Sequence, residues 1–237
     1  MNEVRGIHAV REALRASPGR IRKVVITEGP LDGRKRELIA LCRERGIPVF
    51  RESSERLGQQ GVMAELLEFT WSDLDTLVAE APKPAFFLAL DQVEDPRNLG
   101  AVVRAADGAG VHGIIVPERR TAPPSEATMA ASAGALHHAR IARVRNLADT
   151  LTELKGKDLW SVGLSPDARE PWYRFDFTEP VVVVIGSEGR GLRKRVAATC
   201  DALVSLPQRG QVESLNLSVA AGIVLYEVVR QRAAVGG

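Results

Sequence analysis

The stretch from Val181 to Leu192 reads Val-Val-Val-Val-Ile-Gly-Ser-Glu-Gly-Arg-Gly-Leu. Its first five residues are all β-branched and are followed by a glycine. This pattern is typical of a strand that is buried on both faces, as in a parallel sheet. The stretch therefore predicts an α/β fold, and it places the next loop at the carboxyl edge of the sheet, where α/β domains bind ligands.

Three glycines at 186, 189 and 191 would let this loop turn tightly and let a ligand approach the backbone. A glycine loop after a strand can also be a simple turn. The order G-x-x-G-x-G reverses the dinucleotide fingerprint G-x-G-x-x-G, whose acidic ribose ligand follows at the end of the next strand. Here the next predicted strand ends in Leu206-Pro207, so a nicotinamide site loses its strongest support.

Composition limits the possible classes of protein. With 237 residues, of which 45% are hydrophobic, the chain suits one large domain or a small domain joined to a medium one. The formal charge is only +2, but residues 1–70 hold 13 Lys and Arg against 10 Asp and Glu, and residues 71–237 hold 19 against 20. A mildly basic first part is compatible with RNA contact, although a solvated surface is the commoner meaning of so small an excess.

Targeting, membrane and disulfide signals are absent from the sequence. The start has an early acid and no apolar run, and nowhere do 18 apolar residues follow one another. Cys42 and Cys200 form neither a disulfide framework nor a metal-ligand pattern. We therefore expect a soluble, cytoplasmic protein without a membrane partner.

Periodicity and breakers divide the chain into two domains. Residues 1–70 form a small β/α domain that includes a short helix around 54–57, residues 71–84 read as a partly helical linker, and residues 85–237 form the second domain. In the second domain the pattern predicts strands at 85–90, 112–116, 139–144, 159–163, 181–185 and 202–206. Helices are predicted at 96–110, 125–135, 146–155 and 215–232, and a polar loop at 166–180.

Three polar segments follow strands of the second domain: Asp95–Arg104, Gly186–Gly191 and Leu206–Ser218. Each has an ordinary structural interpretation. Asn98 could belong to a helix start, Arg104 could be a surface arginine, and Asn216 could cap the last helix. Their joint appearance, in this order and spacing, is the specific signal.

These segments resemble the motifs of the SpoU/TrmH family of RNA ribose 2′-O-methyltransferases, and most closely its RlmB type, which modifies a guanosine of 23S rRNA. The motifs are D-P-x-N-x-G…R in the first segment, G-x-E-x-x-G in the second and L-P…S-L-N-x-S in the third. Gly6–Val10 resembles the opening of the family's RNA-binding domain, so the resemblance spans nearly the whole chain. Gln59 departs from the family, in which histidine is common, and this puts a histidine-dependent RNA contact in doubt.

The resemblance implies a fold, partners and a reaction. It implies an amino-terminal RNA-binding domain and a carboxy-terminal α/β-knot domain with a mainly parallel sheet, in which the second and third motifs form the loops of a trefoil knot. It also implies a homodimer whose site is completed across the interface, with large-subunit rRNA as substrate and S-adenosylmethionine as methyl donor. No metal is needed, because the donor is already activated and the protein mainly aligns the reacting atoms.

The resemblance also assigns residues to the site. The polar active-site set is Asn98, Arg104, Glu188, Ser214 and Asn216. The donor-binding set is Ile185, Gly186, Gly191, Leu206, Leu215 and Asn216. Asn98 and Arg104 lie about 9 Å apart along one helix and point about 120° apart, so they would contact different parts of one nucleotide.

Arg104 has two possible roles. The family casts it as the base that takes the 2′-OH proton, yet a charged guanidinium has no acceptor site. We favour the alternative that Arg104 holds a phosphate and stabilises the developing alkoxide. Other functions stay open at this point: an RNA-binding module without activity, a transfer-RNA enzyme, and a resistance methyltransferase that acts on another rRNA site.

Overall fold

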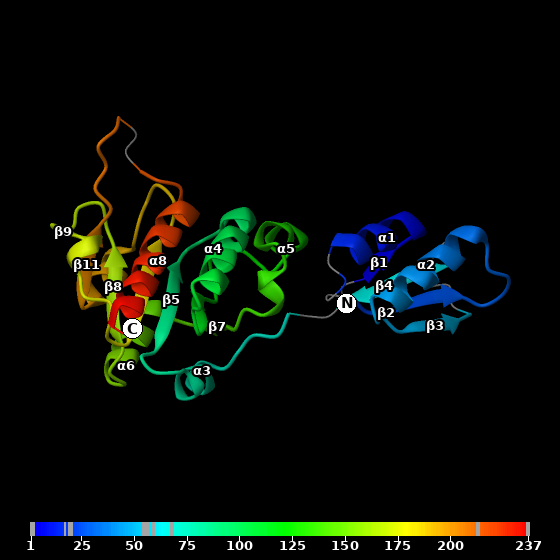
Figure 1. Cartoon of the computed structure of the whole chain (residues 1–237), viewed down its shortest axis with the longest axis horizontal. Coiled ribbons are helices and arrows are strands. Elements are labelled where there is room, and N and C mark those ends of the chain that lie inside the picture. The colour runs from blue at the N-terminus through cyan, green and yellow to red at the C-terminus, as the bar shows by residue number, and fades with distance from the viewer. Residues whose placement is uncertain are drawn as a thin grey trace. The chain divides into compact units, whose positions relative to one another are not determined.

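The computed structural model describes residues 3–16, 18, 21–53, 57, 60–66, 69–211 and 214–235. The chain divides into two compact units, Met1–Thr70 and Trp71–Gly237 (Figure 1). The short helix expected around 54–57 lies largely outside the described residues.

The first unit contains a mixed four-stranded sheet in the order β1-β4-β2-β3. Strands β1 and β2 pair antiparallel with β4, and β2 pairs parallel with β3. Apolar side chains of two helices, such as Leu14 and Leu38, pack with Val24 and Ile26 in its core. The elements are β1 (Glu3–Arg5), α1 (Ile7–Ala16), β2 (Ile21–Thr27), α2 (Gly33–Glu44), β3 (Val49–Glu52) and β4 (Val62–Leu66).

The second unit is built on a seven-stranded parallel sheet in the order β7-β6-β5-β10-β8-β11-β9. Strand β10 is buried along its whole length and pairs with β5 and β8, which confirms the buried parallel strand expected from the valine run. The strands are β5 (Phe86–Asp91), β6 (Gly113–Pro117), β7 (Ile141–Val144), β8 (Trp160–Leu164), β9 (Glu170–Pro171), β10 (Val181–Gly186) and β11 (Ala202–Ser205).

Helices cover both faces of this sheet (Figure 1). Leu77 of α3, Leu151 of α6 and Val196 of α7 pack with Val182 and Val184 on one face. Helices α4 and α8 lie on the other face, and α5 packs along α4. The helices are α3 (Leu74–Glu80), α4 (Pro96–Gly108), α5 (Glu126–Ser132), η3 (Ala135–His137), α6 (Leu147–Lys155), η4 (Trp172–Arg174), α7 (Lys194–Thr199) and α8 (Leu217–Val235).

Residues 71–84 are part of the second unit, which corrects their assignment to a linker. Asp73 caps α3 by accepting a hydrogen bond from the Thr76 amide at 2.9 Å, and Leu77 of this helix is fully buried. Ser72 forms a parallel bridge to Ala142 of β7. The acids and prolines of this segment suggested a linker. They surround a short apolar stripe, and this stripe is buried only when the segment packs onto the second unit.

Close packing of α4 on α5 depends on Gly100, the glycine of the first motif. A Cβ atom on Gly100 would lie 2.4 Å from the Thr128 carbonyl oxygen and 2.6 Å from the Ala131 Cβ. Asp95 caps α4 through the Arg97 amide at 2.7 Å, and Pro96 is its first residue. The helix start is therefore held firmly at the carboxyl edge of the sheet. No helix among the described residues is both long and apolar enough to cross a bilayer.

Candidate active site

One residue from each of the three motifs meets in a single hydrogen-bonded cluster. The Asn98 Nδ2 donates to Glu188 Oε2 at 2.8 Å, and the Asn216 Nδ2 donates to Asn98 Oδ1 at 3.1 Å. The first bond spans 90 residues of sequence and the second 118. We call Asn98, Glu188 and Asn216 the polar triad. Because Asn98 uses both ends of its amide, it holds the other two residues in fixed positions.

Asn216 also begins α8. Its Oδ1 accepts hydrogen bonds from the Ser218 amide at 2.9 Å and from the Ser218 hydroxyl at 2.6 Å. The ordinary interpretation of this asparagine, a helix cap, and its place in the polar triad therefore apply together. A carboxylate at this position could still cap the helix, but it could not donate to Asn98.

A cavity of about 440 Å³ opens beside the triad at the carboxyl edge of β8, β10 and β11. We call it the larger cavity. Its lining includes every residue of the expected donor-binding set except Asn216, together with Ser214. These lining residues are Leu164, Ser165, Pro166, Ile185, Gly186, Ser187, Glu188, Gly189, Gly191, Leu206, Gln208, Ser214, Leu215, Leu217 and Ala220.

A smaller, more polar cavity of about 250 Å³ lies next to it, between the ends of β5 and β10. It is lined by Gln92, Val93, Glu94, Asp95, Asn98, Ser187, Glu188, Arg190 and Leu217. The two cavities share Ser187, Glu188 and Leu217. Glu188 therefore stands on the border between a largely apolar cavity and a polar one.

The glycine loop folds back onto the end of β10. Ser187 and Gly191 exchange two backbone hydrogen bonds of 3.1 and 2.9 Å. A Cβ atom on Gly186 would lie 2.0 Å from the Gly191 carbonyl carbon, so no larger residue fits there without moving the loop. Gly189 and Gly191 have φ angles of 76° and 64°, in the left-handed region that favours glycine. Glycine is thus needed in this loop because the backbone folds tightly to form the wall of the larger cavity. For Gly186 the sequence analysis expected another reason, the close approach of a ligand.

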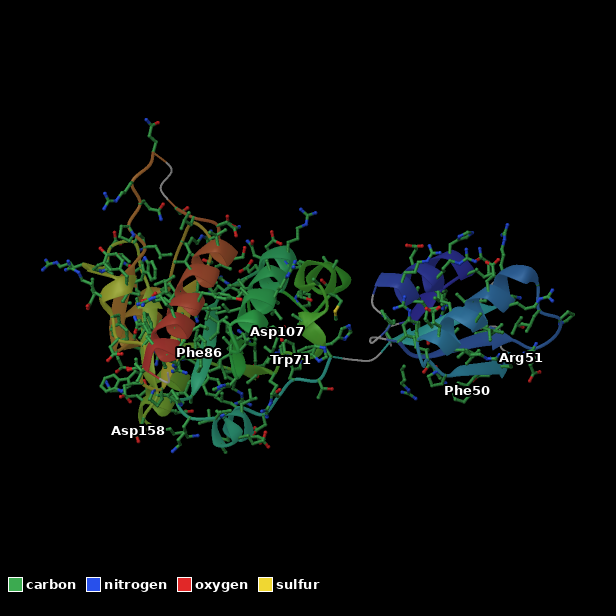
Figure 2. All side chains as sticks on the ribbon, viewed as in Figure 1. Phe50, Arg51, Trp71, Phe86, Asp107 and Asp158 are labelled. Carbon is green, nitrogen blue, oxygen red and sulfur yellow. The ribbon has the colours of Figure 1, made fainter. Side chains whose placement is uncertain are left out.

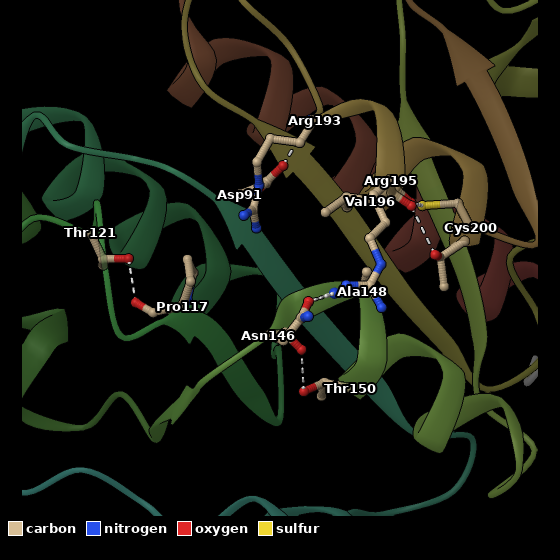
Figure 3. A network of polar contacts seen from close by, with 11 residues as sticks. Asp91, Pro117, Thr121, Asn146, Ala148, Thr150, Arg193, Arg195, Val196 and Cys200 are labelled. Atoms are coloured by element: carbon tan, nitrogen blue, oxygen red, sulfur yellow. Dashed lines mark hydrogen bonds and ion pairs between the residues drawn. The ribbon is translucent and has the colours of Figure 1, made fainter.

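An ion pair between a buried carboxylate and an exposed arginine, which the sequence analysis missed, anchors this loop. Asp91, the last residue of β5, is fully buried and accepts from the Arg193 amide at 2.9 Å and from Arg193 Nε at 2.8 Å (Figure 3). Asp91 also lies in register with Gly186. The pair therefore ties the end of the glycine loop to the neighbouring strand. The sequence feature that could have revealed this ion pair is Asp91 itself, an acidic residue at the end of an otherwise apolar strand.

Cys200 is a partly buried, free cysteine that lies near this anchor. Burial raises the pKa of its thiol to about 12, and the negative charges of Asp201 and Asp91 add to the shift. Its Sγ donates to the Val196 carbonyl oxygen at 3.3 Å. A thiol held protonated in this way does not form a covalent intermediate at neutral pH.

Arg104 stands apart from the polar triad within one chain. Its side chain is exposed on α4, and it lines neither the larger nor the smaller cavity. It makes no side-chain hydrogen bond or ion pair within the part of the chain that the structure describes. One chain thus brings Asn98, Glu188 and Asn216 together beside Ser214, but leaves Arg104 outside.

Comparisons with known proteins identify the family of this chain. The model of the SpoU rRNA Methylase family matches residues 85–226, and the model for RNA 2′-O ribose methyltransferase substrate binding matches residues 4–66. The chain is 40% identical to the "Putative TrmH family tRNA/rRNA methyltransferase YacO" of Bacillus subtilis, over 98% of this chain and 96% of that protein. It is 38% identical to the 23S rRNA (guanosine-2′-O-)-methyltransferase RlmB of Escherichia coli, over 96% and 97%.

Solved structures give the same result. The SpoU methyltransferase AviRb from Streptomyces viridochromogenes, in complex with the cofactor AdoMet, aligns with a TM-score of 0.71 at 27% identity, over 98% of this chain and 90% of that one. The AdoMet-bound rRNA methyltransferase from Sinorhizobium meliloti aligns with a TM-score of 0.68 at 29% identity, over 96% and 86%.

Fold and site together define an RNA ribose 2′-O-methyltransferase with its own substrate-binding domain. The chain belongs to the SpoU rRNA Methylase family. The family resemblance drawn from the three motifs is thereby confirmed.

Proposed function

We propose that this protein transfers a methyl group from S-adenosylmethionine to the ribose 2′-OH of a guanosine in 23S rRNA. The observation that carries the proposal is the polar triad, in which the three motifs meet on the border of two adjoining cavities. The choice of 23S rRNA guanosine is supported by relatives of that name, which match this chain over almost its full length at 37–38% identity. We place the reaction in the cytoplasm, where rRNA is found.

The larger cavity suits the methyl donor. Its volume of about 440 Å³ falls within the range of about 300–1,000 Å³ that is usual for small-molecule sites. Apolar side chains of Ile185, Leu206 and Leu215 would contact the adenosine, and the backbone of Gly186 and Gly191 offers polar groups to its edge and to the methionine part. When bound, the donor supplies a methyl group that is already activated for transfer. We further propose that the loops 186–191 and 206–218 are the knotted loops of the family.

The smaller cavity suits the target ribose. A 2′-OH placed there would meet Glu188 at the border, where its carboxylate can accept the hydroxyl proton in a hydrogen bond. Asn98 is then a positioning residue that fixes one oxygen of Glu188, and Asn216 fixes Asn98. Alignment of the hydroxyl oxygen with the methyl carbon is the main contribution that such a site makes.

A second copy of the chain would complete the site. Val219 and Tyr226 of α8 are 50% and 53% exposed, and with Ile223 they form one helical face. This face borders α4, since a Cβ atom on Gly108 would lie 2.9 Å from the Tyr226 hydroxyl oxygen. We propose that two chains pack through this face, and that the exposed Arg104 enters the partner's smaller cavity.

The proposed substrate is tested by mapping ribose methylation in rRNA from a strain in which the gene is deleted. One guanosine of 23S rRNA should lose its 2′-O-methyl group and regain it when the parent gene is restored, but not when Asn98→Ala is restored. Purified protein should methylate a 23S rRNA fragment that contains this guanosine. Loss of a methyl group from another rRNA or from transfer RNA alone would contradict the proposal.

A further inference from the structure

Beyond the smaller cavity the carboxyl edge of the sheet continues to β6 and β7, where three arginines are exposed. Arg119 and Arg120 lie in the turn after β6, and Arg145 directly follows β7. Among the described residues none of the three has an ion-pair or side-chain hydrogen-bond partner. We call Arg119, Arg120 and Arg145 the arginine track.

The turn that carries the first two arginines is fixed at both ends. The Glu118 amide donates to the Val144 carbonyl oxygen of β7 at 2.9 Å, and the Ala122 amide donates to the Val93 carbonyl oxygen at 2.8 Å. Val93 itself lines the smaller cavity. The Thr121 hydroxyl closes the turn on the Pro117 carbonyl oxygen at 2.7 Å (Figure 3). The backbone that carries Arg119 and Arg120 is therefore tied to the strand end beside the smaller cavity.

Most exposed charges are only solvated surface, so the neighbours of the arginine track are informative. Several arginines of the second unit have acidic partners: Arg193 pairs with Asp91, Arg195 with Asp149 and Arg140 with Glu80. Arg119, Arg120 and Arg145 have no acidic partner among the described residues, and they lie along the carboxyl edge that leads away from the smaller cavity. Arg145 also precedes Asn146, which caps the nine-residue helix α6 through the Ala148 amide at 3.1 Å, so the positive end of that helix adds to the local potential.

We propose that the arginine track binds the phosphate backbone of the RNA beside the target nucleotide. This inference rests on the proposed function, since it takes the smaller cavity as the ribose site. Guanidinium groups stay charged and can bind phosphate oxygens in a bidentate manner. Contacts of this kind set the position and register of the RNA and do not read its sequence.

The strand order shows why the RNA backbone runs toward β7. The smaller cavity lies between β5 and β10, and the larger cavity lies over β10, β8 and β11. Arg169 and Arg174, on the β9 side, lie beyond the larger cavity, so a backbone running that way would have to cross the donor site. A backbone running over β6 and β7 leaves the donor site free.

The chain itself enters the second unit on the β7 side. Ser72 bridges to Ala142 of β7. The residue before Ser72, Trp71, is labelled in Figure 2. The guanidinium carbon of Arg143 lies 4.8 Å from the ring centre of Trp71. The covalent connection to the substrate-binding unit is thus attached beside the strand that carries one end of the arginine track.

The test replaces all three arginines of the track at once, as Arg119→Gln, Arg120→Gln and Arg145→Gln. A matched control removes the same charge away from the track, as Arg169→Gln, Arg174→Gln and Lys83→Gln. Binding of the 23S rRNA fragment is measured between 50 and about 300 mM salt, a range in which phosphate contacts dominate the dependence. Donor binding is measured by calorimetry, and single-turnover methylation is measured with saturating RNA.

The track variant should bind RNA about 10- to 100-fold more weakly, with a salt slope that is lower by roughly 2 to 3, because each phosphate contact contributes about 0.7 to 0.9 to that slope. Its donor affinity and its methylation rate at saturating RNA should stay within about twofold of the parent, and the control variant should bind RNA as the parent does. Unchanged RNA affinity in the track variant, or an equal loss in the control, overturns the inference. This result differs from the one expected if the proposed function is wrong. In that case the parent protein itself would leave the 23S rRNA fragment unmethylated.

Discussion

Asn98 illustrates how much one side chain contributes at the scale of single residues. Its amide donates to Glu188 and accepts from Asn216, so each motif depends on it. Asn98→Asp keeps the size of the side chain but removes the donor and brings two carboxylates into contact. We expect the single-turnover methylation rate to fall about a hundredfold or more, as for loss of one preorganised donor in an active site, with donor affinity little changed.

The control for this change is Asn146→Asp at the start of α6. There the asparagine only accepts a hydrogen bond from the Ala148 amide, and a carboxylate can do the same. This variant should keep the parent's rate. If Asn98→Asp methylates RNA as fast as the control does, the polar triad has no part in the reaction.

The role of Arg104 can also be tested with a single substitution. The pH profile of the variant's methylation rate distinguishes the two possible roles. If Arg104 binds a phosphate and stabilises developing charge, Arg104→Ala should lower the single-turnover rate at every pH and leave any ionisation of the enzyme in the profile where it was. The rate is measured with donor and RNA saturating. An ionisation near neutral pH that disappears in Arg104→Ala, with both affinities intact, would instead support the arginine as the base.

At the scale of elements, the end of β10 and its glycine loop form one structural unit. Gly186→Ala would place a Cβ atom 2.0 Å from the backbone of Gly191, so the loop would have to leave β10 and the larger cavity would lose a wall. We expect donor affinity to fall at least about tenfold, which corresponds to about 1.4 kcal/mol, together with a lower Tm. Calorimetric titration with the donor and thermal unfolding measure the two effects.

Gly210→Ala is the matched control for this prediction. Gly210 lies in the loop after β11 and has open space around it, with no heavy atom within 4 Å of an added Cβ. Its alanine variant should bind the donor as the parent does. Parent-like donor affinity in Gly186→Ala would contradict the placement of the donor in the larger cavity.

At the scale of the whole molecule, the exposed face of α8 and the isolated Arg104 lead to a prediction about mixed dimers. In a two-fold symmetric dimer with Arg104 acting across the interface, Arg104→Ala and Asn98→Ala chains should each be inactive alone. Mixed together and allowed to exchange, they form heterodimers in which one of the two sites has neither defect. Random exchange should therefore restore about a quarter of the parent's activity, since half of the dimers are mixed and each has one intact site.

The readout is methylation of the 23S rRNA fragment before and after chain exchange, with sedimentation to confirm that dimers are present. If Arg104 acts within its own chain, every site in the mixture keeps one defect and activity stays at background. A monomer in sedimentation would also contradict the interface on α8.

Local pattern was enough to predict several features of this protein. The β-branched run Val181–Ile185 predicted a buried parallel strand because a side chain on either face of a central strand must be apolar. The three motifs predicted the family and seven of the fifteen residues that line the larger cavity, since each motif is a short local pattern. Helix starts such as Asp95-Pro96 followed from capping chemistry that operates within one turn.

Only the tertiary structure determined which of these segments contact one another. The bonds of the polar triad join residues 90 and 118 positions apart, and they exist because the strand order places β10 beside β5. The same adjacency creates the Asp91–Arg193 anchor. Gly186 is necessary because its own loop folds back onto it. The short apolar stripe of α3 became part of the second unit only because β7 and its neighbours offer a surface on which Leu77 is buried. Periodicity indicates which residues of one segment are buried. The segment that buries them depends on the spatial order of the strands in the sheet.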